Sequence, residues 1–456
     1  MSELKSTFNK ESEIAFNEEH WQKINYNTSC YERNFTKGIT KYQDIDLEKE
    51  RAYTVRNKSL LNLEKLLVDF ETHFTANGGK VLWARDAQDA RNQILEIINK
   101  QPQKNVTRSN STVLDEIGLN DFLQKKNIPL TETSVARYVL QVNGLRPYHP
   151  IAPAIHLSKE EINGVLTENF RLKADSSVKQ MVNFIRYKVS NEIKNASVCI
   201  TGANFLLSDV GGVVLTENEG NILKSISSAN VHIVVAGLAK VVSSIDDLGV
   251  LLPLLSAHAT GQSMAACNSI TFGPSVGADG PQQMYVILLN NNRTELLSHE
   301  KQRQVMSCIH CGACVSVCPI YKNIGGNSYG TAHIGPLGII MNPLMNGLDE
   351  YAHFTSACSL CGRCTEVCPV RIPLDDLIVE NRHLSHIEKV GDAKIDSLFN
   401  ALIWHCKSRK KMEAPLWLKR IEIKKFVGPV IGTRRAMPEI STKSYSQMWR
   451  EINGEE

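Results

Sequence analysis

One cysteine-rich unit occurs twice in this chain of 456 residues. The first copy, residues 308–320, reads CIHCGACVSVCPI, and the second copy, residues 358–370, reads CSLCGRCTEVCPV. Seven positions are identical between the copies: the four cysteines, one glycine, one valine and the proline. The chain has to fold so that each copy brings its cysteines together, and this requirement constrains the architecture more than any other feature.

Each copy follows the spacing C-x2-C-x2-C-x3-C-P, which is the ligand run of bacterial-type ferredoxins that hold [4Fe–4S] clusters. Gly312 and Gly362 fit a tight ligand loop, because a Cβ would obstruct the close approach of the backbone. In two-cluster ferredoxins the fourth cysteine of each run ligates the other cluster. The spacing therefore predicts two [4Fe–4S] clusters, one held by Cys308, Cys311, Cys314 and Cys368, and the other by Cys358, Cys361, Cys364 and Cys318.

Two other interpretations of the cysteines stay open. Zinc also uses C-x2-C pairs, although a tetrahedral zinc site takes two pairs and not a triplet with a Cys-Pro repeated whole. Alternatively, the clusters are structural, although shared ligation holds two clusters close enough to form an electron relay. We interpret His310 and Arg363, which lie inside the loops, as surface positions. The other four cysteines have no partner at ligand spacing and are predicted to be ordinary thiols: Cys30, Cys199, Cys267 and Cys406.

Composition excludes several classes of protein. Twelve cysteines without a secretory signal favour metal binding in a reducing compartment over a disulfide scaffold. The formal net charge is only +3, which gives no global field for nucleic acid. No run of about eighteen apolar residues is present, so no transmembrane segment is expected. We therefore expect a cytoplasmic protein, with a peripheral position at the inner face of the membrane as the alternative.

The remaining chain alternates between helical and extended patterns. Apolar residues at helical spacing predict helices at 59–74, 86–99, 114–125 and 240–252, the last one ending before Pro253. Apolar runs rich in β-branched residues predict buried strands at 81–84, 197–201, 212–216, 232–236 and 283–289. This alternation predicts an α/β layer domain over residues 56–295, after a helical extension at residues 1–55.

The two cysteine copies then define a cluster module over residues 296–386, with an inserted loop and helical segment between them. Residues 387–456 are predicted to form a basic helical tail. Its stretch 404–435 holds ten Lys or Arg and two Glu, interleaved with Trp404, Trp417, Leu418 and Phe426. Solvated amphipathic helices are the favoured interpretation, because the aromatic residues form no continuous stripe. A docking face for an acidic partner or an anionic membrane surface is the alternative.

Several short strings resemble a known family. They are APAIH at 152–156, ITGANF at 200–205, TENEGN at 216–221, DGP at 279–281, IGG at 324–326 and GPLG at 335–338. Together with the cysteine copies, these strings resemble the lactate-utilisation protein B family, the iron–sulfur subunit of a three-component system that oxidises L-lactate. The resemblance extends from about residue 50 into the tail, and it is specific as a combination of strings.

The resemblance implies a fold, a function and partners. The α/β domain would be a three-layer lactate-utilisation domain, similar to the isomerase and CoA-transferase group, and the cluster module would be a helical two-cluster ferredoxin domain. Electrons from L-lactate, which becomes pyruvate, would pass through the clusters to a downstream acceptor. The partners would be a cysteine-rich subunit and a small lactate-utilisation subunit, and the chain alone would not be catalytic.

Glu217 and Glu219 are the weak candidates for catalytic residues. Both follow a predicted strand, and CoA-transferases use a Glu beside Asn and Gly. The favoured alternative is a turn in which Gly and Asn take up positive φ angles. The sequence contains neither a G-x-G-x-x-G fingerprint nor a P-loop that would indicate a nucleotide or flavin site.

Two further functions stay open at this point. One is an iron–sulfur subunit that serves another 2-hydroxy acid, such as glycolate. The other is an enzyme whose α/β domain carries out acyl or sugar-phosphate chemistry, with clusters that are only structural.

Overall fold

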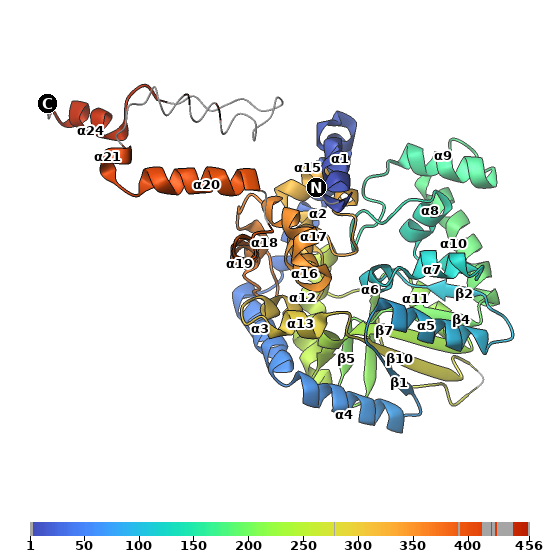
Figure 1. Cartoon of the computed structure of the whole chain (residues 1–456). Helices are drawn as coiled ribbons and strands as arrows, with labels where there is room; N and C mark the ends of the chain where they lie inside the picture. The colour runs from blue at the N-terminus through green and yellow to red at the C-terminus, as the bar shows by residue number, and fades with distance from the viewer. Residues whose placement is uncertain are drawn as a thin grey trace. The chain divides into compact units, whose positions relative to one another are not determined.

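The computed structural model describes residues 3–277, 279–390, 393–412, 421, 425 and 441–454. Its contacts divide the chain into two units, Met1–Asn381 and Arg382–Glu456, and each unit is described by itself (Figure 1). The first unit holds both the strands and the two cysteine copies. The boundaries that the sequence places at residues 55, 295 and 386 stay predictions.

A six-stranded parallel sheet forms the centre of the α/β part (Figure 1). Its strands, in spatial order, are β1 (Lys80–Ala84), β10 (Gln283–Leu289), β7 (Val231–Gly237), β4 (Val198–Thr201), β2 (Val106–Arg108) and β3 (Leu130–Glu132). All seven residues of β7 are buried, as expected for a parallel strand that is covered on both faces. The five predicted strands are therefore present, four of them in this sheet and one in a second sheet.

Helices cover one face of the parallel sheet. They are α5 (Ala87–Asn99), α6 (Thr112–Glu116) and α7 (Leu119–Lys125), and their apolar residues pack on β2, β4, β7 and β10. Asp86 caps α5 by accepting a hydrogen bond from the backbone N–H of Asp89. The helix predicted at 114–125 is interrupted, because Gly118 has a φ of 61° and separates α6 from α7.

A second, four-stranded sheet packs on the other face, together with α4 (Leu63–Ala76) and α11 (Asn221–Ser228). Its order is β8 (Val241–Val242), β5 (Phe205–Leu207), β6 (Gly212–Glu217) and β9 (Cys267–Thr271). Neighbouring residues of β5 and β6 point to opposite faces. Leu206 and Val213 join the core with the parallel sheet, whereas Phe205 and Val214 join a core shared with the cluster module. The α/β part is thus a layered structure, as expected.

The helix predicted at 240–252 is wrong. Residues 241–242 form strand β8, and helix α12 spans Leu248–Thr260 with Pro253 inside it. A proline inside a helix removes one backbone hydrogen bond and costs roughly 3 kcal/mol. Burial of Leu251, Leu254, Leu255 and Ala257 along the same helix offsets that cost.

Three more helices complete this part of the molecule. They are α8 (Val135–Val142), α9 (Lys159–Phe170) and α10 (Val178–Asn195), with a small core of their own around Leu166 and Ile185.

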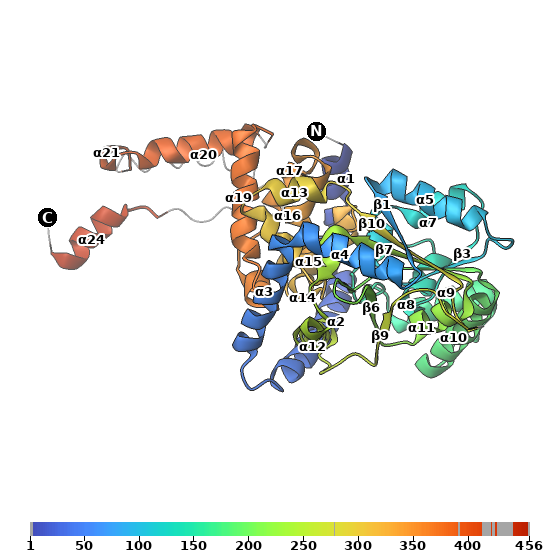
Figure 2. The ribbon, with the colours of Figure 1, turned by 90° about the horizontal axis from the view of Figure 1, so that it is seen from below.

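The N-terminal helices pack against the cluster module (Figure 2). They are α1 (Glu3–Glu11), the 3-10 turn at Ser12–Phe16, α2 (Glu18–Ile39) and α3 (Ile45–Leu61). The ring of Phe8 contacts Tyr329 and Phe354 with centroids 6.0 and 5.5 Å apart. Tyr31 donates a hydrogen bond of 2.7 Å to the carbonyl of His258 in α12. The first helices are therefore built into the core and do not form a loose arm.

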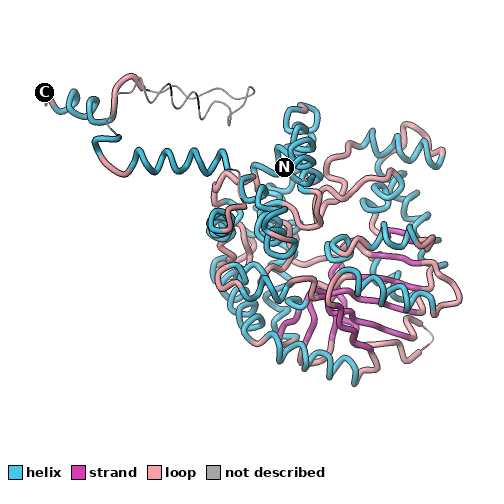
Figure 3. The backbone as a smooth tube through the Cα atoms, viewed as in Figure 1, coloured by secondary structure: helices cyan, strands magenta, loops and turns pink. Residues whose placement is uncertain are grey.

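The segment 293–387, which contains the predicted cluster module at 296–386, consists of helices and loops (Figure 3). Its α-helices are α13 (Arg293–Ser298), α14 (Ala313–Ser316), α15 (Pro319–Ile324), α16 (Gly335–Asn346), α17 (Leu348–Ser356), α18 (Arg363–Glu366) and α19 (Leu374–Ile387). Helices α16 and α17 form the predicted insertion between the cysteine copies. The buried face of this module and the outer face of the second sheet share one core.

The second unit contains α20 (Ala393–Cys406), α21 (Arg409–Met412) and α24 (Tyr445–Asn453) among its described residues. Trp404 is exposed on α20, but Trp417, Leu418 and Phe426 lie outside the described residues. Both interpretations of the basic tail therefore stay open. Among the described helices of the chain, none has the length and apolar character needed to cross a membrane.

Candidate metal centre and adjoining pocket

The two cysteine copies fold into loops with the same backbone conformation. In the first copy His310 and Gly312 have φ angles of 60° and 74°, and in the second copy Leu360 and Gly362 have φ angles of 52° and 76°. Left-handed conformations are uncommon for residues other than glycine, so the matching φ angles of His310 and Leu360 show that both copies adopt the same unusual loop conformation. A short helix follows each loop, α14 in the first copy and α18 in the second.

The same conformation turns backbone N–H groups toward sulfur. The N–H of His310 donates to Cys308 Sγ at 3.3 Å, and the N–H of Leu360 donates to Cys358 Sγ at 3.3 Å. Hydrogen bonds of this kind stabilise negative charge on a thiolate ligand and tune a bound iron–sulfur cluster.

The fourth cysteine of each copy lies just before a proline. Pro319 occupies the first turn of α15, where its missing N–H leaves no hydrogen bond unmade. In the second copy the N–H of Ile372 donates to Cys368 Sγ at 3.4 Å. In both copies the fourth thiol is buried. The exposed fraction is 7% for Cys318 and 8% for Cys368.

The first three cysteines of copy one and the fourth of copy two gather around a small apolar cavity. Its lining includes Cys308, Cys311, Cys314 and Cys368. Burial raises the pKa of the Cys311 thiol, and the neighbouring thiols of Cys308 and Cys368 raise it further. Cys314 has a raised pKa for the same reasons.

The remaining four cysteines also influence one another. Burial raises the pKa of Cys318 to about 11, and Cys358 and Cys361 contribute to that increase. Burial, followed by Cys318 and Cys358, raises the pKa of Cys364 to about 12. Thiols grouped in this way are costly to ionise unless a metal withdraws the negative charge. The donor chemistry and the inward N–H groups in both loops fit [4Fe–4S] clusters.

The surroundings of the two copies differ. In the first copy Ile309 is 2% exposed and Cys311 is 7% exposed, whereas in the second copy Leu360 is 39% exposed and Cys361 lies on the surface. His310 is only partly exposed, so its interpretation as a surface position is wrong, because the α/β part covers the first loop. Arg363 is exposed, as interpreted.

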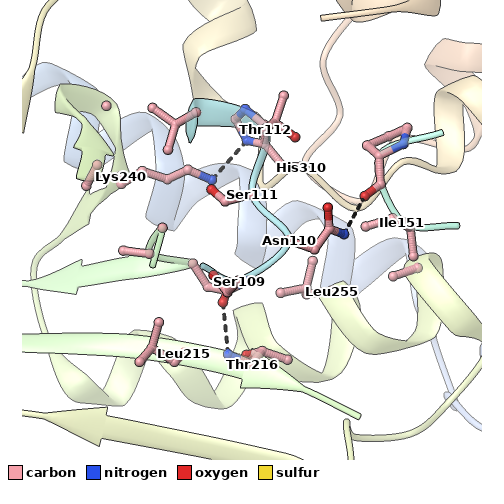
Figure 4. A pocket seen from close by; sticks show the side chains of 18 of the residues that line it. Ser109, Asn110, Ser111, Thr112, Ile151, Leu215, Thr216, Lys240, Leu255 and His310 are labelled. Carbon is pink, nitrogen blue, oxygen red and sulfur yellow. Dashed lines mark hydrogen bonds between the residues drawn. The ribbon is translucent and has the colours of Figure 1, made fainter. Parts of the chain in front are cut away.

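A pocket of about 310 Å³ lies between the first copy and the parallel sheet (Figure 4). It is lined by the segments that follow β2, β4 and β7, at the carboxyl edge of the sheet, where α/β proteins usually bind ligands. A Cβ on Gly202 would collide with Ser111 Oγ, so the close approach of two of these segments depends on that glycine. Cys308 and His310 close the pocket on the side of the cluster module.

Lys240 joins the two parts inside this pocket. Its Nζ lies 3.0 Å from His310 Nδ1, which also lies 3.1 Å from the carbonyl of Cys308 (Figure 4). Burial lowers the pKa of Lys240 to about 8, although Cys308 partly opposes this effect. Burial and then Lys240 lower the pKa of His310 well below its ordinary value, so the imidazole is neutral at pH 7.

A set of hydrogen bonds from Arg56 and a buried ion network around Glu116 stabilise the structure near this pocket. Arg56 is 1% exposed and donates hydrogen bonds to the carbonyls of Ala239, Val241, Met306 and Ser307. Glu116 accepts hydrogen bonds from Arg293 at 2.7 and 2.8 Å and lies 3.0 Å from His333 Nε2. Burial alone would raise the pKa of Glu116, but Arg293 and His333 lower it well below the usual range.

Comparison with known proteins agrees with this arrangement. The family model described as the LUD domain matches residues 67–289, and the model described as the 4Fe-4S dicluster domain matches residues 304–372. The "Uncharacterized electron transport protein YkgF" of Escherichia coli (strain K12) is 36% identical over 74% of this chain and 71% of its own length. "Lactate utilization protein B" of Bacillus cytotoxicus is 35% identical over 76% of this chain and 73% of its own length. The chain belongs to the lactate utilization protein B family.

Membership in the lactate utilization protein B family confirms the resemblance, the fold class and the iron–sulfur nature of the cysteine module. A solved DUF162 family protein from Deinococcus radiodurans covers 50% of this chain and 98% of its own, at 12% identity and a TM-score of 0.29. The fold assignment depends on the two domain matches and not on that likeness.

In this member of the lactate utilization protein B family, Glu217 and Glu219 line the pocket but cap helices. The carboxylate of Glu217 accepts the N–H groups of Ile222 and Leu223 in α11 at 2.7 and 2.9 Å. Glu219 accepts the N–H of Val135 and the hydroxyl of Ser134 at the start of α8. This geometry supports the structural interpretation of both residues, and their catalytic role stays a weak candidate.

The sequence did not single out Lys240, Arg56 or Glu116 as parts of a site. Lys240 carried a signal, because it interrupts an otherwise apolar stretch after β7. Arg56 and Glu116 carried none, since each lies on a helix where a charged residue is ordinarily solvated.

Proposed function

We propose that this chain is the iron–sulfur electron-transfer subunit of a complex that oxidises L-lactate to pyruvate. The observation that carries the proposal is the pair of cysteine loops with matching backbones, set in a chain of the lactate utilization protein B family. The printed name of the Escherichia coli relative, an electron transport protein, supports the same role.

The proximity of the thiols supports the two predicted ligand sets. Cys308, Cys311, Cys314 and Cys368 would hold one [4Fe–4S] cluster, and their common cavity supports this set. Cys358, Cys361, Cys364 and Cys318 would hold the other, and the influence of Cys358 and Cys361 on the pKa of Cys318 supports it. A [4Fe–4S] cluster supplies reversible uptake of single electrons when it is bound.

The two ligand sets occupy different depths in the protein. Cys308 borders the internal pocket, while Cys361 lies on the surface. In the proposed role the surface set faces a partner protein that exchanges electrons with the chain.

The proposed partners are a cysteine-rich subunit and a small lactate-utilisation subunit of the same complex. A downstream acceptor would receive the electrons. A cytoplasmic location is part of this proposal, because that compartment keeps thiols reduced and able to ligate iron.

Metal analysis tests the cofactor. Protein purified without oxygen is expected to be brown and to contain about eight irons with matching sulfide, the content of two clusters. Stoichiometric zinc without sulfide would contradict the proposal. Substitution of Cys30 by Ser provides the matched control, since this cysteine lies outside both sets and should leave the iron content unchanged.

Growth and turnover test the substrate. Deletion of the gene from its host should abolish growth on L-lactate and preserve growth on pyruvate. In the assembled complex, L-lactate should reduce the clusters faster than glycolate does. Normal growth of the deletion strain on L-lactate, or preferential reduction by glycolate, would remove the lactate assignment.

A further inference from the structure

The pocket beside the first cysteine copy has the features of a ligand site. Its volume of about 310 Å³ lies at the lower end of the range for small-molecule sites, roughly 300–1,000 Å³. Three segments at the carboxyl edge of the parallel sheet contribute to it, and the cluster module contributes His310 from the other side (Figure 4).

Lys240 differs from the buried cations that pair with carboxylates. Arg293 is paired with Glu116, and Arg137 is paired with Asp115 and Glu132. Lys240 has no acidic partner among the described residues, and the one hydrogen bond of its ammonium group is to the ring of His310. A cation that is withdrawn from water without a counter-charge is costly, and an anion bound in the pocket would offset that cost.

Free hydroxyl groups accompany this cation. Ser109, Ser111 and Thr112 lie on the segment after β2 and line the same pocket, and Figure 4 shows this segment together with Lys240 and His310. Their side-chain oxygens make no hydrogen bonds to other described residues, although Ser109 is 3% exposed. Hydroxyl groups both donate and accept hydrogen bonds, so those that line the pocket can bind a polar ligand.

One part of the lining is apolar. Leu215 and Leu255 contribute side chains from β6 and α12, and Ile151 contributes one from the segment that covers the first loop. A fully solvated inorganic ion gains nothing from such a wall, whereas a short alkyl group loses contact with water there. The pocket therefore combines one cation without an acidic partner, several hydroxyl groups and a small apolar wall. Its other charged groups already have partners, since Arg293 pairs with Glu116, and Glu217 and Glu219 accept N–H groups at the starts of α11 and α8.

We propose that this pocket binds a small carboxylate carrying a hydroxyl or oxo group, with Lys240 pairing with the carboxylate. The segment 109–112 contributes hydroxyl groups to the polar end of the ligand, and Leu255 covers its alkyl end. The identity of the carboxylate as L-lactate or pyruvate rests on the proposed function, whereas the site itself rests on the cavity and the unpaired cation.

Such a ligand would place a negative charge near Cys308, because Lys240 and Cys308 line the same pocket. Charge and hydrogen bonds around the ligands of an iron–sulfur cluster shift its reduction potential. Binding in this pocket should therefore be visible in the first cluster and absent in the second, whose cysteines do not line the pocket.

Binding to the full-length, iron-loaded chain tests the proposal directly. Calorimetric titration with L-lactate and with pyruvate should give saturable binding, and inorganic phosphate should bind at least about tenfold more weakly. Lys240→Met should weaken carboxylate binding by at least about tenfold, because a charge-assisted hydrogen bond is lost. Ala259→Phe, which fills the pocket from α12 without changing its charge, should weaken binding by a similar factor. Lys301→Met is the matched control, since Lys301 is exposed and pairs with Glu380 outside the pocket.

The outcomes separate this site from a simple counter-charge to the cluster. Carboxylate binding to the wild-type chain, with a shifted potential of the first cluster that Lys240→Met removes, supports the site. The proposal is overturned if neither carboxylate binds, if phosphate binds better than both, or if Lys240→Met binds like the wild type. A potential that changes in Lys240→Met but never responds to carboxylate in the wild type also overturns it, because Lys240 then acts only on the cluster.

Failure of this inference and failure of the proposed function give different results. If the purified chain binds carboxylate but the host grows normally on L-lactate without the gene, the site is supported and the lactate function is rejected. If the purified chain binds no carboxylate but the host requires the gene for growth on L-lactate, the function is supported and the site is rejected.

Discussion

The two cysteine copies have the same backbone and opposite surroundings. The first is enclosed by the α/β part, with Ile309 2% exposed, whereas the second presents Leu360 and Cys361 at the surface. Local spacing determines the loop conformation, since residues at equivalent positions share positive φ angles despite different side chains. Long-range packing determines whether each loop lies against the α/β part or is open to solvent. The first copy borders a pocket, and the second is open to solvent.

Among the substitutions that compare the two copies, replacement of a fourth cysteine is expected to have the largest effect, the loss of one cluster. In Cys368→Ser the first cluster, not the second, should be lost or converted, and total iron should fall by about half. Cys318→Ser, its counterpart, should affect the second cluster instead. Iron and sulfide analysis, with electron paramagnetic resonance of the reduced protein, distinguishes the two. If each substitution affects the cluster of its own copy, the proposed exchange of fourth cysteines is incorrect.

Arginine substitutions compare the buried and exposed surroundings. Arg56 is buried below the first copy and donates to four backbone carbonyls, so Arg56→Met should lower the free energy of unfolding by about 3 kcal/mol. Arg363, in the second copy, makes a surface contact with Glu32, and Arg363→Met should cost about 0.5 kcal/mol. Urea unfolding of the iron-loaded chain measures both. Equal effects would show that the enclosure of the first copy does not stabilise it.

The extent to which these features could be predicted from sequence differs between the sheet and its surroundings. Strands β7 and β10 were predictable because a parallel strand buried on both faces is a continuous apolar run. Strands β5 and β8 have three and two residues, too few to establish a pattern. Helix α12 contradicted its sequence signal, since long-range burial outweighs the cost of Pro253.

The candidate site shows the same division. The cysteines are recognisable because ligation of a cluster imposes a local spacing. The contact between Lys240 and His310 joins residues 70 positions apart, and nothing in either local sequence encodes it. Arg56 was hidden because the buried face of α3 is formed by Ala52, Arg56 and Ser59, which give no apolar periodicity.

Two acidic residues near the copies, Glu116 and Glu32, should differ in how strongly they make the protein's stability depend on pH. Arg293 and His333 hold the pKa of the buried Glu116 far below its unfolded value. Its stabilisation is therefore present above about pH 4.5, the unfolded pKa, and is lost as the pH falls toward the folded pKa. Glu116→Gln should cost about 2 kcal/mol at pH 7 and should make the loss of stability below pH 5 less steep.

Glu32 provides the counterpart beside the second copy. Lys322 and Arg363 lower its pKa, but its side chain is 39% exposed and the interaction is screened. Glu32→Gln should therefore change stability by less than about 1 kcal/mol at pH 7, with little effect on the acid limb. Urea unfolding at pH 7 and between pH 3.5 and 5 checks both variants. A less steep acid limb in Glu32→Gln than in Glu116→Gln would reverse the assignment.

Glycine substitutions give the smallest expected difference and the closest comparison. Gly312 and Gly362 have nearly equal φ angles of 74° and 76°, so alanine should cost about 1 kcal/mol of backbone strain at either position. At Gly312 the added Cβ would also lie 2.9 Å from Ile151 Cγ1, whereas at Gly362 its nearest neighbour is Asp375 Oδ2 at 3.4 Å. Gly312→Ala should therefore be about 1 kcal/mol less stable than Gly362→Ala, because the segment that covers the first loop has to move. Thermal unfolding at equal iron content measures this difference. An identical shift in both variants would mean that the α/β part does not press on the first loop, and that the two copies differ only in solvent exposure.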